Sequence, residues 1–324
     1  MKILVYGFYK HQNMGDDLFM EAYKHLFPNI DFVFTDDIKE WDLDNIDAVF
    51  FGGGSFLLAS PQITDKALVK LRLMKIFYLG VGVEKDIHPI HIELMSLAKM
   101  IATRSPDQLD RLRQINSNVS IIPDLVYSLQ DKVHLSEKSP KSVLVMPNIN
   151  VVPQRSEPHW KHAAWAYFKS EFCQFLDWLG DEGEYHLHLF SMCLGPEADD
   201  DWAASELVGF MDNRSYYYMY SHYRRPANFQ QMTTLISKHD VVITQRFHGI
   251  VLSEMTGTPY IAIHHHDKLK TANHRDGLFL SYYNSSKQLF IDTFEQAIKI
   301  KPATSLPDET STFDAFIKEV IGLL

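Results

Sequence analysis

Residues 241–250, VVITQRFHGI, are the stretch that says most about the fold. The apolar run at its start predicts a buried strand, the polar residues after it predict a turn, and Gly249 is expected to open a helix. A strand that passes through a turn into a helix is the beginning of a βαβ unit. A continuous apolar run is typical of a parallel sheet that is covered on both faces.

The same alternation of short apolar runs and amphipathic segments continues through the chain in two series. The first series has expected strands at residues 2–7, 31–35, 47–52, 75–79, 100–103 and 119–122. The second series has them at residues 142–146, 185–190, 240–244 and 260–263. We therefore predict an α/β protein made of two doubly wound, Rossmann-like domains that face a cleft.

A polar stretch that contains a proline, residues 136–141 (SEKSPK), separates the two series. We predict an N-terminal domain over residues 1–136 and a C-terminal domain over residues 137–300. Residues 301–324 include an amphipathic helix that we expect to pack back on the N-terminal domain. A chain of 324 residues has the length of two ordinary domains.

The composition excludes several classes of protein. Lys and Arg number 31 against 41 Asp and Glu, a net charge of −10, which disfavours broad nucleic-acid binding but allows a local anion site. Cys173 and Cys193 are too few for a disulfide framework. Neither a signal peptide nor an apolar run of about 20 residues is present in the sequence. We expect a soluble, cytoplasmic protein.

Open α/β sheets bind ligands outside the carboxyl ends of their strands, so the residues that follow strands are the candidates. After the strand at 241–244 come Gln245, Arg246, His248 and Gly249. Arg binds phosphate or carboxylate through two hydrogen bonds, and His transfers protons near neutral pH. This group predicts a site for an anionic ligand with a proton-transfer residue.

The next strand leads into His264, His265, His266, Asp267 and Lys268. Lys268 adds a positive charge to the expected anion site. The three histidines lack the HExxH spacing, and we predict a polar segment that lines the cleft and no metal site.

In the first half, the residues that follow the first and third strands are Asn13, Gly15, Asp16, Gly53, Gly54 and Ser55. Asp16 is expected to cap the next helix, and the glycines let a backbone approach a ligand closely. Arg104 follows the strand at 100–103. These turns match neither GxGxxG nor a Walker P-loop. Tight turns with a capped helix, and a surface ion pair for Arg104, explain the same residues without a ligand.

These motifs, taken in order, resemble the polysaccharide pyruvyl transferase family, and the resemblance covers most of the chain. They are N-x-G-D at 13–16, GGGS at 52–55, LGVG at 79–82, Arg104–Ser105, PDLVY at 123–127, R-x-H-G at 246–249, GTP at 257–259, and Lys268. Two departures stand out. The family's usual Arg-Asp pair is here Arg104-Ser105-Pro106-Asp107, so the acidic residue is displaced. Residues 10–12 lack the usual glycines.

The resemblance implies a fold like that of GT-B glycosyltransferases and the transfer of pyruvate from phosphoenolpyruvate to two hydroxyls of a sugar. The product is a cyclic ketal of a cell-surface polysaccharide or exopolysaccharide, and no cofactor is implied. His248 is then the general acid, while Arg246 and Arg104 hold the anionic groups. Gln245, Gly249 and Lys268 complete the donor site. The six residues of the first and third turns, named above, face the acceptor.

The acceptor is expected to be a glycan or a lipid-linked sugar, which would place the protein at the inner face of the membrane. Association into a homo-oligomer stays open. Two other functions fit the same residues. A glycosyltransferase would place the phosphates of a nucleotide sugar at the helix N-terminus at Gly249. A non-catalytic carbohydrate-binding relative is kept open by the displaced Asp107.

Overall fold

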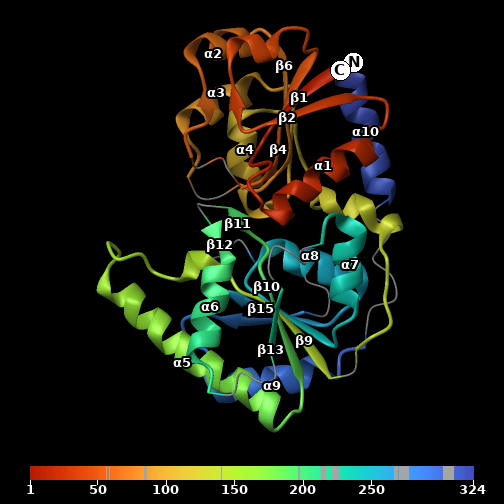
Figure 1. The fold of residues 1–324 in the computed structure, drawn as a ribbon. Helices are drawn as coiled ribbons and strands as arrows, with labels where there is room; N and C mark the ends of the chain where they lie inside the picture. The colour runs from red at the N-terminus through yellow and green to blue at the C-terminus, as the bar shows by residue number, and fades with distance from the viewer. Residues whose placement is uncertain are drawn as a thin grey trace. The chain divides into compact units, whose positions relative to one another are not determined.

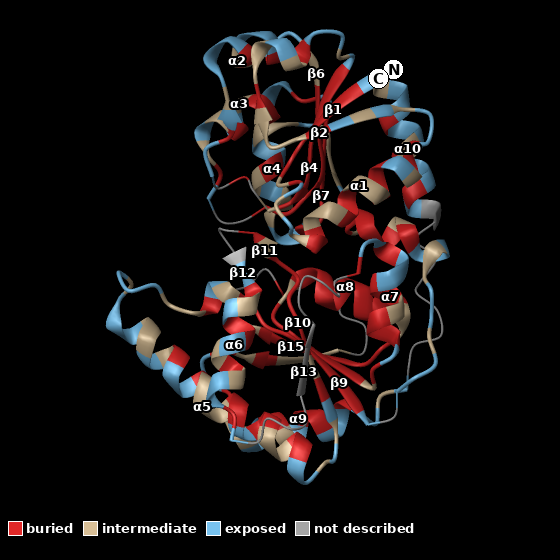
Figure 2. Ribbon diagram, viewed as in Figure 1, coloured by how far each residue is buried: buried red, intermediate tan, exposed pale blue. Residues whose placement is uncertain are grey.

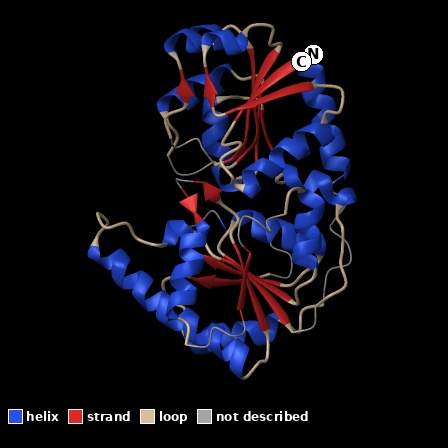
Figure 3. Ribbon diagram, viewed as in Figure 1, coloured by secondary structure: helices blue, strands red, loops and turns tan. Residues whose placement is uncertain are grey.

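The computed structural model describes residues 1–55, 57, 59–83, 86–139, 141–195, 198–212, 217–220, 226–265, 269, 277–301 and 310–324. The chain divides into two compact units (Figure 1). The first contains residues 1–131 and 307–324, and the second contains residues 132–306. Each unit has one large sheet with helices packed around it (Figure 3).

The N-terminal unit is built on a six-stranded parallel sheet in the order β2-β1-β4-β6-β7-β8. Its strands are β1 (Lys2–Tyr6), β2 (Asp31–Thr35), β4 (Ala48–Gly54), β6 (Lys75–Val81), β7 (Met100–Thr103) and β8 (Val119–Ile121). Two short strands, β3 (Asp37–Ile38) and β5 (Gln62–Ile63), pair separately. The chain leaves β1 towards β2 and later returns to β4 on the other side of β1. This reversal places a topological switch point between β1 and β4.

The helices of this unit are α1 (Met14–Leu26), α2 (Asp65–Leu71), α3 (Pro89–Leu97), α4 (Leu109–Ile115) and α10 (Thr310–Leu323), with 3₁₀ turns η1 (Glu40–Leu43), η2 (Pro106–Gln108) and η3 (Leu125–Lys132). The sheet is buried on both faces (Figure 2). On one face Tyr78 packs in the core that α2, α3 and α4 cover. On the other, Phe50 contacts Phe27, which also contacts Phe316 of α10. The two covered faces explain why the strands are apolar without alternation.

The C-terminal unit has a second six-stranded parallel sheet, in the order β13-β10-β9-β14-β15-β16. Its strands are β9 (Ser142–Met146), β10 (His186–Phe190), β13 (Tyr217–Tyr220), β14 (Val241–Thr244), β15 (Tyr260–His264) and β16 (Leu278–Ser281). Numbered along the chain, this is the order 3-2-1-4-5-6 of dinucleotide-binding Rossmann folds. The switch point therefore lies between β9 and β14.

The helices of this unit are α5 (His159–Asp181), α6 (Asp200–Phe210), α7 (Phe229–Ser237), α8 (Phe247–Thr256) and α9 (Lys287–Ala297), with the 3₁₀ turn η4 (Ile149–Val151) and the antiparallel pair β11 (Leu194–Gly195) and β12 (Ala198–Asp199). Phe175 of α5 stacks on Phe290 of α9, and Phe172 packs against the same ring at a tilt. None of the helices in the described residues is both long enough and apolar enough to cross a membrane.

Several predicted elements need correction. The helix expected to open at Gly249 begins at Phe247. The sequence also predicts helices over residues 165–178 and 18–27, and in the structure these helices begin earlier, at His159 and Met14. The sequence interpretation missed α2, α6 and α9 and the edge strands β13 and β16.

Candidate active site

The turn after β14 is fixed by Thr244, the last residue of that strand. Its hydroxyl accepts a hydrogen bond from the amide of Arg246 (3.0 Å) and donates one to the carbonyl of Arg246 (3.1 Å). Arg246 is the N-cap residue of α8. The closed turn places Gln245, Arg246 and His248 together at the carboxyl end of β14, beside the switch point of the sheet.

Gly249 lets the first turn of α8 pack directly on the strand ends. A Cβ atom at this position would lie 2.2 Å from Oγ1 of Thr244 and 2.9 Å from Sδ of Met146, which ends β9. His248, one residue earlier, is 8% exposed and packs edge-on against the ring of Phe247. The backbone of α8 is thereby held where its first N–H groups can bind an anion.

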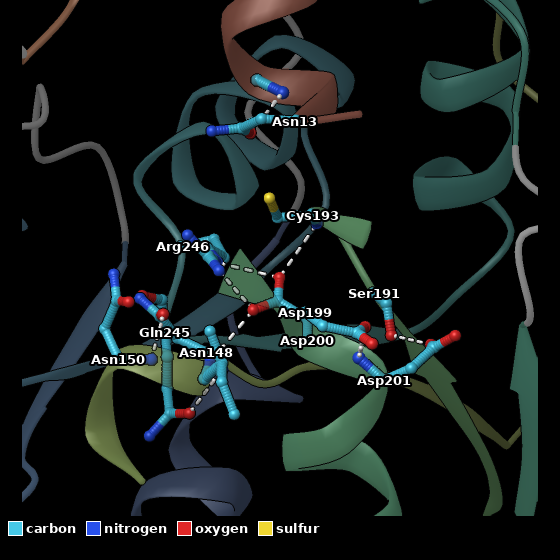
Figure 4. Close-up of polar contacts among 12 residues, drawn as sticks. Asn13, Asn148, Asn150, Ser191, Cys193, Asp199, Asp200, Asp201, Gln245 and Arg246 are labelled. Atoms are coloured by element: carbon cyan, nitrogen blue, oxygen red, sulfur yellow. Dashed lines mark hydrogen bonds and ion pairs between the residues drawn. The ribbon is translucent and has the colours of Figure 1, made fainter. Parts of the chain in front are cut away.

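The side chain of Arg246 is bound by the carboxylate of Asp200 (Figure 4). Nε of Arg246 donates to Oδ2 of Asp200 at 3.0 Å, and Nη2 donates to Oδ1. Asp200, the first residue of α6, is fully buried and also accepts from the amides of Ile149 and Cys193, both at 3.0 Å. A guanidinium has five N–H groups, so Arg246 can bind a second anionic partner while it stays paired with Asp200.

The pairing with Asp200 changes the role that Arg246 can have. Burial raises the pKa of Asp200, and the Arg246 guanidinium and the two amides act in the opposite direction. An ionised pair of this kind has no net charge. Arg246 therefore offers a rigid fork of hydrogen-bond donors rather than a free positive charge.

Gln245 and Asn148 connect the two strands that flank the switch point (Figure 4). The amide of Gln245 donates to the carbonyl of Met146, and the amide of Asn148 donates to Oε1 of Gln245, each at 3.0 Å. Nδ2 of Asn148 donates to the carbonyl of Gln245 at 3.3 Å. Nε2 of Gln245 is buried, and no acceptor for it lies among the residues that the structure describes. A ligand oxygen would satisfy this donor, which is costly to leave unpaired.

In the N-terminal unit, Asn13 caps α1 by accepting from the amide of Gly15 at 3.2 Å. Asp16 was expected to be the cap, and this expectation is wrong because Asp16 already lies within the helix. Its carboxylate instead accepts from Nδ2 of Asn13 at 2.5 Å. A Cβ atom on Gly54 would lie 2.7 Å from Oδ1 of Asp16, so the turns after β1 and within β4 are in contact.

Arg104, which follows β7, is buried and paired with Asp124. Its Nη2 lies 3.5 Å from Oγ of Ser55, and its guanidinium lies over the ring of Phe19. Asp107, the displaced acidic residue, is exposed and accepts from Nε2 of Gln108 at 2.9 Å. The acidic partner of Arg104 is thus Asp124, and Asp107 has no part in this pair.

The predicted site residues fall into two groups, one in each unit. Gln245, Arg246, His248 and Gly249 belong to the C-terminal group. The residues of the N-terminal group are Asn13, Gly15, Asp16, Gly53, Gly54, Ser55 and Arg104. Lys268, His266 and Asp267 lie outside the described residues. Within the described ranges, no three His, Cys, Asp or Glu side chains are grouped as metal ligands.

Sequence reasoning did not identify Asp200, Asn148 or Asp124 as site residues. Asn148 comes two residues after β9, so the rule of searching behind strands would have found it. Asp124 belongs to the segment 123–127, which was used only as a motif of the family resemblance and not as a source of site residues. Asp200 belongs to the acidic run at 199–201, which looks like an ordinary helix start.

The two sheets and the residues behind their strands define an α/β protein with two Rossmann-like units, as predicted. Three solved structures share this fold. UDP-GlcNAc 2-epimerase of Methanocaldococcus jannaschii is 9% identical with a TM-score of 0.63, covering 99% of each chain. S. aureus MnaA, in a co-structure with UDP, is 10% identical with a TM-score of 0.62, covering 100% of this chain and 97% of that one. Anabaena HepE in complex with UDP-glucose is 12% identical with a TM-score of 0.57, covering both chains fully.

At such low identity these likenesses show the fold alone. No curated protein matches the sequence. The model of one family does match it, over residues 13–267, which is more than half of the chain. The chain belongs to the polysaccharide pyruvyl transferase family.

Proposed function

We propose that the protein transfers the pyruvyl group of phosphoenolpyruvate to two hydroxyls of a sugar and so forms a cyclic ketal in the synthesis of a cell-surface polysaccharide. In this reaction the methylene carbon of the donor gains a proton, and two sugar oxygens bond to the neighbouring carbon. The bond from that carbon to the phosphate oxygen breaks. The two hydroxyl protons balance the one added to carbon and the one that leaves with phosphate, and nothing is oxidised or reduced.

The observation that carries this proposal is the Arg246–Asp200 pair beside the switch point of the C-terminal sheet. A fork of donors fixed by a buried carboxylate suits a planar carboxylate or a phosphate. The buried Nε2 of Gln245 and the first N–H groups of α8 offer further donors to the same anion. Because the Arg246–Asp200 pair is neutral, we assign the balancing positive charge to Lys268.

His248 is the proton donor in this proposal. It stands in the first turn of α8, two residues after Arg246, and is nearly buried. A positioned acid of this kind contributes about 10²- to 10⁴-fold to the rate. Protonation of the methylene carbon makes its neighbour electrophilic, which prepares it for the first sugar hydroxyl.

The acceptor sugar is assigned to the N-terminal unit. The turns that carry Asn13 to Asp16 and Gly53 to Ser55 contact each other through Asp16 and Gly54. They offer carboxylate, amide and hydroxyl groups, which hydrogen-bond sugar hydroxyls. Arg104 is fixed beside Ser55 by Asp124, and we assign it to the anionic groups of the reacting donor.

The test compares donors and then removes the acid. Phosphoenolpyruvate should raise the melting temperature of the protein, because a ligand that binds only the folded state stabilises it. UDP-glucose should not. A shift with the nucleotide sugar alone would favour a glycosyltransferase instead.

His248→Gln should then abolish phosphate release from phosphoenolpyruvate while the heat of donor binding persists. Arg246→Lys keeps the charge but loses the fork, so it should weaken donor binding. Normal turnover by His248→Gln would place the acid elsewhere.

A further inference from the structure

The loop between β1 and α1, residues 7–13, crosses the switch point of the N-terminal sheet. At its start the amide of Gly7 donates to the carbonyl of Thr35, at the end of β2, at 3.0 Å. The hydroxyl of Tyr9 donates to the carbonyl of Gly52 in β4. The loop is thus tied to the strands on both sides of β1, at the edge where ligands of such sheets bind.

Two residues of this loop have an unusual backbone. Lys10 and Gln12 have φ angles of 65° and 56°, in the left-handed region that favours glycine. These positions lack the glycines that the family resemblance leads one to expect. Long side chains held in this conformation are uncommon and gather at functional sites. The residue that lies between them is His11.

His11 is oriented by two contacts from different parts of the chain. Its Nε2 lies 2.5 Å from Oδ2 of Asp36, which follows β2. Its ring stacks on that of Phe8, with 4.0 Å between the centroids and 9° between the planes. Because a carboxylate accepts, Nε2–H is the donor, and Nδ1 is left as the nitrogen that can take a proton. The side chain of His11 is 30% exposed, so it can be reached by a ligand.

We propose that His11, positioned by Asp36, is the general base that removes the proton from the first attacking hydroxyl of the acceptor sugar. This inference rests on the proposed function, which assigns an acid but no base. As the sugar oxygen bonds to the carbon of the protonated donor, its proton passes to Nδ1 of His11. Solvent then carries that proton away, and a solvent proton restores His248. The proton of the second hydroxyl leaves with phosphate, so the step balances.

The experiment measures phosphate release from phosphoenolpyruvate with a panel of hexopyranosides offered as methyl glycosides, as oligosaccharides and as lipid-linked sugars, each of which has suitable pairs of hydroxyls. His11→Phe keeps a ring to stack on Phe8 but has no nitrogen. We expect its kcat to fall by about 10²-fold or more while the KM for phosphoenolpyruvate stays unchanged. Asp36→Asn should lower kcat by a smaller factor, because it leaves the imidazole of His11 in place but less firmly oriented. The KM values for phosphoenolpyruvate and for the acceptor sugar should stay unchanged.

The matched control is His25→Phe. His25 also faces an aspartate in this unit, Asp131, at 3.5 Å, but it lies in the last turn of α1, away from the loop. This variant should keep full activity. Circular dichroism and the melting temperature report whether each variant is folded.

The outcomes separate the inference from the function on which it rests. If wild-type protein releases phosphate and His11→Phe does so equally fast, His11 is not the base. A change in acceptor KM alone in Asp36→Asn would make Asp36 a binding residue and end its positioning role. If wild-type protein releases phosphate with no member of the panel, the proposed function is overturned and the assignment of His11 falls with it.

Discussion

The guanidinium of Arg246 and the carboxylate of Asp200 form a two-point ion pair across 46 residues of sequence. The carboxylate is fully buried, and two backbone amides complete its hydrogen bonds. A pair of this kind fixes the orientation of the guanidinium, and the carboxylate neutralises its positive charge. Removing one partner leaves the other charge buried without compensation, which is strongly destabilising.

Asp200→Asn should therefore lower both stability and donor affinity. The substituted amide brings N–H groups against the N–H groups of Arg246 and the two backbone amides. We expect the free energy of unfolding to fall by about 3–5 kcal/mol. In the folded fraction, phosphoenolpyruvate should bind more weakly because Arg246 is no longer fixed. Urea denaturation and calorimetric titration measure the two effects.

The control for this change is Asp201→Asn, at the next residue, whose carboxylate accepts from the hydroxyl of Ser191 instead of from Arg246. It should change donor affinity little. If folded Asp200→Asn bound the donor as tightly as the wild type, Arg246 would not depend on Asp200 for its orientation.

The same substitution should have a large effect at one of the two aspartates near Arg104 and almost none at the other. Asp124 is buried and paired with Arg104, and its Oδ1 accepts from the amide of Val126 at 3.0 Å. Asp124→Asn should lower the melting temperature of the protein strongly and reduce turnover. Asp107 is exposed, so Asp107→Asn should stay within about 0.5 kcal/mol of the wild type. Equal effects of the two substitutions on thermal unfolding would contradict the assignment of Asp124 as the partner.

Substitution of Gly249 tests how closely α8 packs on β14, and substitution of Gly209 in α6 is the matched control. In Gly249→Ala the added Cβ would lie 2.2 Å from Oγ1 of Thr244, so strand and helix must separate. Overpacking of this kind costs about 1–3 kcal/mol. It should also shift the turn that holds Arg246 and His248, and lower turnover.

At Gly209, in α6, an added Cβ atom would meet no atom within 4 Å among the described residues, apart from the adjacent residues and the backbone of the helix itself. Gly209→Ala should stabilise the protein by up to about 1 kcal/mol, because alanine loses less backbone entropy in a helix. Chemical denaturation measures both variants. A Gly249→Ala protein as stable as the wild type would mean that the contact between α8 and β14 is looser than these distances indicate.

The interior strands were predictable because a strand that is buried on both faces appears in the sequence as a continuous apolar run. Residues 100–103 and 142–146 were expected as strands, and β7 and β9, which lie inside their sheets, occupy the same positions. The edge strands were predicted less consistently. Those of the N-terminal sheet, β2 and β8, were expected at residues 31–35 and 119–122, whereas β13 and β16, at the edges of the C-terminal sheet, were missed. The strands that were predicted are enough to define the fold class.

The sequence predicted those site residues that are close to one another along the chain. Gln245, Arg246 and His248 share one turn, and their position behind a strand is visible in the sequence. The partners Asp200 and Asp124 come from other elements, and no local pattern connects them to their arginines. Asp107 was nearer in sequence to Arg104 and therefore drew attention, although the fold brings Asp124 to it instead.

Two buried histidines should make stability depend on pH. Burial, and then the neighbouring His188, lowers the pKa of His239 to about 4, and its Nδ1 lies 2.9 Å from the carbonyl of Leu235. Burial, and then His88, lowers the pKa of His91 to about 4. In the unfolded chain a histidine has a pKa of about 6.5. Between these values the unfolded state binds more protons than the folded state, so acid favours unfolding.

The contribution of each neutral histidine is complete above pH of about 6.5 and is lost as the pH falls towards about 4. A shift of this size corresponds to about 3 kcal/mol for each residue. His239→Gln should be less stable at pH 7 but should lose less stability on acidification, because one of the two groups is gone. His159→Gln, at the exposed start of α5, should follow the wild-type curve. Urea unfolding measured between pH 4 and pH 7 provides the comparison, and parallel curves for wild type and His239→Gln would show that His239 takes up its proton over the same pH range in the folded protein and in the unfolded chain.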